Sequence, residues 1–314
     1  MTAAFVFPGQ GSQAVGMGKA LAEGFAAARQ VFEEVDAALA DRLSQIMWNG
    51  PAETLTLTEN AQPALMAVSL AAMRVLEAEA GVNLARDAAF LAGHSLGEYS
   101  ALAAAAAISV ADAAKLLRIR GHAMQKAVPV GKGAMAALIG LELPAVQTIA
   151  AEAAGAEICA AANDNGGGQV VLSGDKSAVE RAVEIAKGRG AKRALMLPVS
   201  APFHCALMRP AADVMAEALG AVTIHRARVP VVANVLARPV SDPADILRCL
   251  VEQVTGTVRW RESVDFMVQA GVTTFYEVGA GKVLTGLIKR IAAAADASSI
   301  GSPEDVARFK SARA

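Results

Sequence analysis

The stretch that most constrains the fold runs over residues 89–107, where a short apolar segment enters the pattern Gly93-His94-Ser95-Leu96-Gly97. The apolar segment predicts a buried strand, and the alanine-rich residues 102–107 predict a helix. A Gly-x-Ser-x-Gly pattern between a strand and a helix is typical of a nucleophile elbow, a sharp turn with a serine at its apex. A glycine-flanked helix cap is the alternative, and the flanking elements favour the elbow.

Each residue of this pattern has a physical task. Gly93 and Gly97 remove side chains where backbone segments must approach closely. Ser95 would stand at the N-terminus of a helix, where unpaired N–H groups and the helix dipole stabilise a developing oxyanion. We therefore predict that Ser95 is a nucleophile.

Strands and helices are expected to alternate along most of the chain. This order predicts an α/β core, of the α/β-hydrolase type, with a mainly parallel sheet. The polar residues 298–314 are expected to pack loosely. The expected strands are residues 4–7, 88–92, 229–235 and 273–278, and the expected helices are residues 21–39, 61–80, 110–128 and 246–254.

The pattern changes between residues 130 and 198. The expected order there is β-α-β-β-α-β, which is a ferredoxin-like unit. We therefore predict an inserted subdomain at residues 130–198, and a catalytic domain made of residues 1–129 and 199–314. The expected strands of the insert are residues 134–140, 158–162, 169–173 and 191–197, with helices at residues 144–154 and 176–188.

Charge and cysteine content exclude several classes of protein. The 29 basic and 30 acidic residues nearly balance, which argues against a general nucleic-acid surface. Cys159, Cys205 and Cys249 form neither a metal-ligand pattern nor a disulfide framework, as in a reducing compartment. The start of the chain lacks a basic segment, and the longest apolar run, residues 101–111, is too short to span a bilayer. We expect a cytoplasmic protein without metal or membrane association.

A serine nucleophile needs a base, and the chain has four histidines. His94 adjoins Ser95 and would point away from it, His122 falls on a polar helix face, and His225 lies in a basic stretch. His204 follows a loop that leads back from the insert, which is a common place for a catalytic residue. No acid occupies a recognisable third position, and a backbone carbonyl can orient a histidine equally well.

Arg120 is the second unusual residue. At 100° per residue it lies within an apolar stripe of its helix, beside Leu116, Leu117 and Met124. A buried guanidinium must be paired, either with a structural carboxylate or with the carboxylate of a substrate. Periodicity leaves both interpretations open. Gln10, in a glycine-rich loop after the first strand, is a weak candidate for an oxyanion hole, and that loop lacks a nucleotide-binding pattern.

Together these motifs resemble the malonyl-CoA:acyl carrier protein transacylases, the fatty-acid-synthesis members of the acyltransferase family. The resemblance runs nearly end to end, and its one noted departure is Ala280, where the family often has proline. The motifs that carry it are residues 5–13 (FVFPGQGSQ), 93–102 (GHSLGEYSAL), 120–121 (RG), 202–208 (PFHCALM) and 276–284 (YEVGAGKVL).

The resemblance implies a role for each of several residues. Ser95 would carry the acyl group and His204 would be its base, oriented by the backbone carbonyl of Gln253. Arg120 would bind the free carboxylate of malonyl. Gln10 and the backbone N–H of Leu96 would form the oxyanion hole, Met124 and Phe203 would line the pocket, and Leu96 and Phe203 match the malonyl-selective pattern.

The implied substrates are malonyl-CoA and holo acyl carrier protein, with no bound cofactor, in a monomer. An acidic carrier would dock on a basic surface, for which Lys187, Arg189, Lys192 and Arg193 are candidates; an ordinary solvated face is the alternative. Two other functions compete: a serine esterase or thioesterase, and a silent acyl-binding subunit of a synthase. A polyketide rather than a fatty-acid pathway also remains open.

Overall fold

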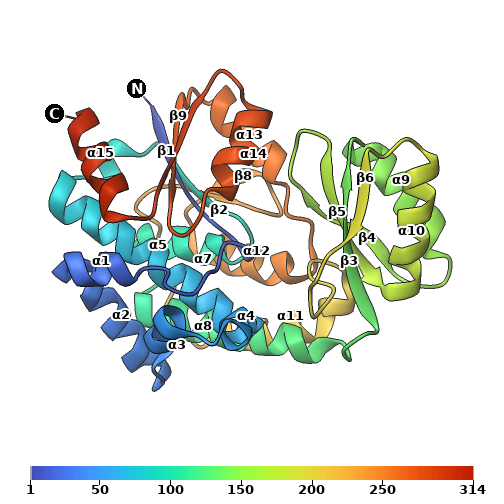
Figure 1. Ribbon diagram of the computed structural model, residues 1–314, viewed down its shortest axis with the longest axis horizontal. Coiled ribbons are helices and arrows are strands. Elements are labelled where there is room, and N and C mark those ends of the chain that lie inside the picture. The colour runs from blue at the N-terminus through green and yellow to red at the C-terminus, as the bar shows by residue number, and fades with distance from the viewer. Residues whose placement is uncertain (1, 314) are drawn as a thin grey trace.

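The computed structural model describes residues 2–313 and has two lobes of different size, seen side by side in Figure 1. The larger lobe contains a six-stranded sheet in the order β10-β9-β1-β2-β7-β8. Its strand pairs are parallel except for β7 and β8, which are antiparallel. The strands are β1 (Ala3–Phe7), β2 (Phe90–Gly93), β7 (Val231–Ala233), β8 (Arg238–Val240), β9 (Thr274–Val278) and β10 (Asp296–Ile300).

The sheet is buried on both faces because its central strands carry apolar residues at every position. In β1, Phe5 and Phe7 face one layer of helices, whereas Ala4 and Val6 face the other. The first layer includes most of the helices, and the second consists of α13 (Trp260–Gln269) and α14 (Val283–Ile291). The α/β character and the mainly parallel sheet are therefore as the sequence predicted.

The first layer is dominated by α5 (Thr58–Ala80), which is buried along most of its length. The helix predicted over residues 21–39 is two helices, because Phe25 is extended at φ −135°. The remaining helices of the larger lobe are α1 (Lys19–Gly24), α2 (Ala26–Leu39), α3 (Leu43–Asn49), α4 (Ala52–Thr56), α6 (Leu84–Asp87), α7 (Gly97–Ala104), α8 (Val110–Ala127), η1 (Ala206–Met208), α11 (Arg209–Gly220), α12 (Pro243–Thr255) and α15 (Pro303–Arg313).

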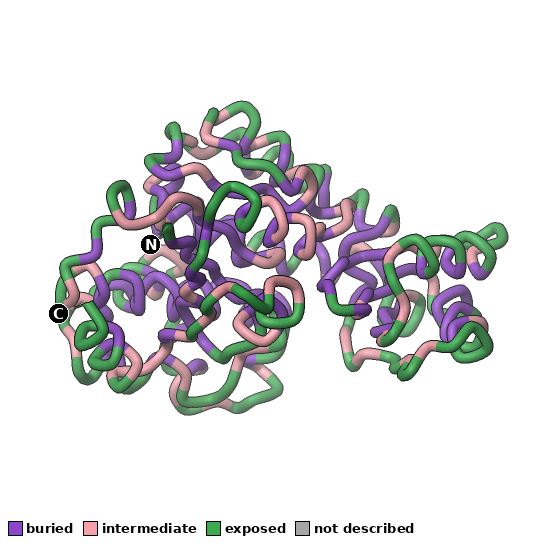
Figure 2. The backbone as a smooth tube through the Cα atoms, turned by 90° about the horizontal axis from the view of Figure 1, so that it is seen from above, coloured by how far each residue is buried: buried purple, intermediate pink, exposed green. Residues whose placement is uncertain are grey.

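The smaller lobe has its own antiparallel sheet in the order β4-β5-β3-β6. Residues such as Leu138 and Leu172 pack one face against two helices, whereas Met135, Ala137 and Val171 on the other face contact the core of the larger lobe. Figure 2 shows the exposed outer side of this lobe. Its elements are β3 (Gly133–Ile139), α9 (Leu143–Ala154), β4 (Cys159–Asp164), β5 (Gln169–Asp175), α10 (Lys176–Gly188) and β6 (Arg193–Met196).

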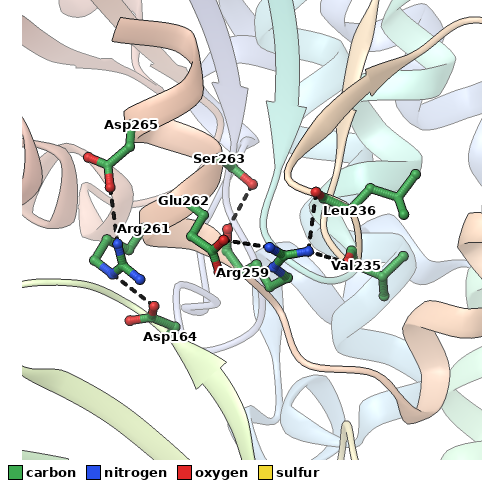
Figure 3. A network of polar contacts seen from close by, with 8 residues as sticks. All are labelled: Asp164, Val235, Leu236, Arg259, Arg261, Glu262, Ser263 and Asp265. Atoms are coloured by element: carbon green, nitrogen blue, oxygen red, sulfur yellow. Dashed lines mark hydrogen bonds and ion pairs between the residues drawn. The ribbon is translucent and has the colours of Figure 1, made fainter. Parts of the chain in front are cut away.

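The end of β4 ties the two lobes together. The N–H of Asp164 donates to the carbonyl of Val258 at 2.9 Å, and the N–H of Val258 donates to Ala162 at 2.8 Å. Arg261, in the first turn of α13, reaches across to the buried carboxylate of Asp164 at 2.9 Å (Figure 3). The nearby Arg259 stays within the larger lobe, where it pairs with Glu262.

The end of the chain differs from expectation. Residues 298–313 were expected to pack loosely, but β10 extends the sheet beside β9, and α15 buries Val306 and Phe309. The ring of Phe309 meets that of Tyr276 with centroids 5.0 Å apart. The prediction was wrong for this segment because two apolar residues three apart anchor an otherwise polar helix; Ala314 lies outside the described residues.

No helix within residues 2–313 combines the length and the apolar character that crossing a membrane requires.

Candidate active site

The turn at Ser95 connects β2 to α7 at the carboxyl edge of the parallel sheet. Ser95 has a positive φ of 53°, which is rare for a residue with a side chain and marks a strained turn. A Cβ added to Gly93 would lie 1.9 Å from the Gly97 carbonyl oxygen, and one added to Gly97 would lie 2.3 Å from that of Phe7. Both glycines are therefore required by close backbone approach.

The hydroxyl of Ser95 meets the imidazole of His204. The distance from Oγ to Nε2 is 2.8 Å, and Nδ1 of His204 lies 2.9 Å from the carbonyl oxygen of Gln253. Because a carbonyl only accepts, Nδ1 carries the proton and Nε2 is left to accept from the serine hydroxyl. Burial and, secondarily, the charge of Arg120 lower the pKa of His204 to about 3, which keeps the imidazole neutral at physiological pH.

Arg120 reaches the same hydroxyl from α8. Its Nη2 donates to Ser95 Oγ at 3.1 Å and to Gln253 Oε1 at 2.8 Å, while Nη1 donates to Gln62 Oε1 at 2.6 Å. The side chain is buried, as its place in the apolar stripe predicted, and burial lowers its pKa. Among residues 2–313, no carboxylate accepts a hydrogen bond from it. Within the described residues, the guanidinium is held by neutral groups and makes no ion pair.

Two side chains form hydrogen bonds with the backbone of the turn. Asn234, just after β7, accepts the N–H of Ser95 at 2.7 Å and donates to the Gly93 carbonyl at 2.7 Å. The Nε2 of Gln253 donates to the Ser95 carbonyl at 3.0 Å. The interpretation of the sequence did not include Asn234, because its partners lie more than 130 residues away and no local pattern marks it.

A cavity of about 730 Å³ opens over Ser95 between the lobes. Residues of both lobes line this cavity, and those of the smaller lobe include residues of its antiparallel sheet. The candidates Gln10, Met124 and Phe203 line it, and Leu96, next to Ser95, is the N-cap residue of α7. Residues that the sequence did not single out also line it: Gln62, Asn163, Asn165, Gln169, Lys282 and Arg290.

The other histidines lie as their positions indicated. The Nε2 of His94 lies 2.9 Å from Oδ1 of Asn165 in the smaller lobe. His122 is half exposed and pairs with Glu59, and His225 is exposed. Within residues 2–313, no three His, Cys, Asp or Glu residues gather in a group that could hold a metal ion.

Comparison with known proteins identifies the class to which this fold and site belong. Residues 4–307 match the acyl transferase domain family. Because the match covers almost the whole chain, the chain belongs to the acyl transferase family.

Several relatives within that family share one activity in their names. The malonyl CoA-acyl carrier protein transacylase of Escherichia coli K12 is 47% identical over 304 residues, covering 97% of each chain, and that of Bacillus subtilis 168 is 46% identical, covering 96% of this chain and 94% of the relative. A crystal structure of the acyl-carrier-protein-S-malonyltransferase from Bartonella henselae superposes with a TM-score of 0.97 at 56% identity, covering 99% of both chains. The chain therefore groups with the malonyl CoA-acyl carrier protein transacylases.

Proposed function

We propose that this chain transfers the malonyl group from malonyl-CoA to the phosphopantetheine thiol of acyl carrier protein, through a malonyl-serine intermediate. The observation that carries the proposal is the buried guanidinium of Arg120, 3.1 Å from the hydroxyl of Ser95 and held by neutral partners. A buried cation beside a nucleophile suits an acyl group that carries its own carboxylate. An esterase of simple esters has no use for it.

In the first half-reaction, His204 Nε2 takes the hydroxyl proton while Ser95 Oγ attacks the thioester carbonyl. An amide N–H of Gln10 and the backbone N–H of Leu96 stabilise the oxyanion of the tetrahedral intermediate. As the intermediate collapses, the carbon–sulfur bond breaks, and the imidazolium returns its proton to the CoA sulfur. The product is a malonyl ester of Ser95.

In the second half-reaction the carrier thiol gives its proton to His204 and attacks the ester carbonyl. The serine oxygen leaves with that proton, and the malonyl thioester of the carrier is released. The Gln253 carbonyl holds the imidazole in the tautomer that both steps need. Arg120 binds the malonyl carboxylate through both steps, where it replaces the serine hydroxyl as the partner of Nη2.

We also infer that residues 130–198 form a ferredoxin-like subdomain inserted into an α/β-hydrolase-like domain made of residues 1–129 and 199–314. The strand order β4-β5-β3-β6 supports this inference, as do the two helices packed on one face of that sheet. The inserted sheet provides one wall of the cavity, and Met124 and Phe203 provide apolar lining near the acyl group.

The partner is an acidic carrier protein that docks beside the smaller lobe. One solved relative, 42% identical with a TM-score of 0.96, is a malonyl-transacylase in complex with the acyl carrier protein of a type II polyketide synthase. Lys187 and Arg189 already pair with Glu184 and Glu152, whereas Lys192 and Arg193 are exposed and have no ion pair within residues 2–313. We propose these two for docking, in a cytoplasmic monomer that binds no cofactor.

Intact-protein mass spectrometry after mixing with malonyl-CoA tests the function, with Ser95→Ala as the control. We expect a malonyl adduct on the wild type alone, discharged by holo acyl carrier protein. Steady release of free CoA without an adduct would instead indicate hydrolysis. Faster discharge by a polyketide carrier than by a fatty-acid carrier would assign the chain to the polyketide pathway.

A further inference from the structure

Glu98 is a buried carboxylate in the first turn of α7, directly behind the nucleophile, and the mechanism above does not use it. Its Oε2 accepts the N–H of Asn234 at 3.0 Å and the Nε2 of Gln253 at 2.8 Å. Both partners themselves hold the active site, since Asn234 binds the backbone of Ser95 and Gln253 binds Arg120. Glu98 thus joins two side chains that reach the site from different elements.

The carboxylate makes the shortest hydrogen bond to the donor end of the Gln253 amide and so helps to fix which way this amide faces. An amide has a donor end and an acceptor end, and a carboxylate oxygen that accepts two N–H groups can face only the donor end. The Ser95 carbonyl accepts from this donor end as well, at 3.0 Å, alongside the N–H of Glu98 at 3.0 Å, and holds the amide in the same sense. With Nε2 held by Glu98, Oε1 of Gln253 must face Nη2 of Arg120, where it accepts at 2.8 Å.

We propose that Glu98 is a positioning residue for acyl selection: it fixes the Gln253 amide so that Oε1 anchors Arg120 toward the acyl carboxylate. This inference rests on the proposed malonyl transfer. His204 does not depend on this amide, because it binds the backbone carbonyl of Gln253, which α12 holds. Loss of Glu98 should therefore affect the recognition of the acyl group more than the activation of the serine.

The arrangement does not depend on the charge of Glu98. Burial raises the pKa of this carboxyl to about 7, against the opposing effect of its two hydrogen bonds and of Arg120. In the neutral acid, one oxygen carries the proton and the other still accepts two hydrogen bonds. An acceptor at the Oε2 position is what the proposal requires, and glutamine can supply one.

The test compares malonyl-CoA with acetyl-CoA as donors for Glu98→Ala and Glu98→Gln. In Glu98→Ala, we expect kcat/KM for malonyl to fall roughly 10- to 100-fold more than that for acetyl, the loss expected when buried polar groups lose their partner. Glu98→Gln should recover most of the malonyl preference. Equal losses for both donors, or a Glu98→Gln variant as impaired as Glu98→Ala, would overturn the proposal.

A double-mutant cycle with Gln253→Leu separates positioning from general destabilisation. Because Glu98 acts through the amide of Gln253, adding Glu98→Ala to Gln253→Leu should change the malonyl-to-acetyl ratio little further. Additive changes in that ratio would contradict the proposal, and thermal unfolding checks that each variant is folded. If Glu98→Ala does not fold, Glu98→Leu, which fills the space but offers no acceptor, replaces it in the same cycle.

The wild type separates this inference from the function on which it rests. A wild-type protein that forms no malonyl adduct contradicts the proposed function itself. A wild type that transfers malonyl, with Glu98→Ala keeping the wild-type ratio, contradicts only the role of Glu98.

Discussion

The two sheets of this protein contribute to one cavity in different ways. The parallel sheet of the larger lobe is covered on both faces and holds Ser95 at its carboxyl edge, on a turn fixed by buried hydrogen bonds. The antiparallel sheet of the smaller lobe is covered by helices on one face, and its other face is a cavity wall. The residues of the proposed acyl transfer thus come from the larger lobe, whereas both lobes line the cavity.

The largest loss of activity is expected from a substitution in the larger lobe. Ser95→Ala removes the nucleophile and should reduce malonyl transfer on the order of 10⁴-fold or more. Mass spectrometry should find no adduct after mixing with malonyl-CoA. The exposed Ser109→Ala is a control that should keep the adduct; a stable adduct on Ser95→Ala would place the nucleophile elsewhere.

The next effect concerns the acyl group. Arg120→Ala should reduce malonyl transfer roughly 100-fold or more, because a charge-assisted pair with the substrate carboxylate is lost. Acetyl transfer should survive, since acetyl has no carboxylate. Arg118→Ala, two residues away and partly exposed, is the matched control. Steady-state kinetics with both donors decide the matter, and equal losses for both would indicate a structural role for Arg120.

The smaller lobe is expected to matter for the carrier. Reversing two charges with Lys192→Glu and Arg193→Glu should raise KM for acyl carrier protein about tenfold at low salt, through loss of electrostatic attraction. The rate of acylation by malonyl-CoA should not change. Lys187→Glu, at a position already paired with Glu184, is the control. An unchanged KM in the double variant would place docking on another surface.

A substitution at the junction between the lobes should change activity less. Arg261→Ala leaves the buried carboxylate of Asp164 without its cation and should lower thermal stability, as loss of one partner of a buried pair does. We expect KM for malonyl-CoA to rise about 3-fold, because the two walls of the cavity are held together less firmly. Asp265→Asn removes only the contact of Arg261 within α13 and is the control. If both variants behave alike, the junction does not control the cavity.

The smallest effect is expected from pH. A histidine with an ordinary pKa near 6.5 would be protonated, and lost as a base, as the pH falls below that value. Because the pKa of His204 is lowered to about 3, the neutral base should persist, and the acylation rate should stay level from pH 8 to roughly pH 5. Pre-steady-state acylation across this range measures it. A drop centred near pH 6.5 would show that His204 is more solvated than its burial indicates.

Several features could be predicted from the sequence because short stretches encode them. The turn at Ser95 follows from five adjacent residues, and the burial of Arg120 follows from the period of one helix. The strands of the smaller sheet and four of those in the larger sheet, β1, β2, β7 and β9, follow from the spacing of apolar segments, whereas β8 and β10 were not predicted. The same reasoning from short stretches gave a wrong prediction for residues 298–313, because two apolar residues were too few to indicate a packed helix.

The tertiary structure alone decided how these parts meet. Gln62 and Gln253 hold Arg120 from 58 and 133 residues away, and Glu98 meets Gln253 across 155 residues. Such contacts depend on strand order and on the packing of helices against the sheet, which no short window of sequence contains. The sequence by itself determined the turn and the inward arginine, because each depends on neighbouring residues, and it selected the candidate base by elimination among four histidines. Their hydrogen-bonded arrangement depends on distant ones, and only the folded chain brings those together.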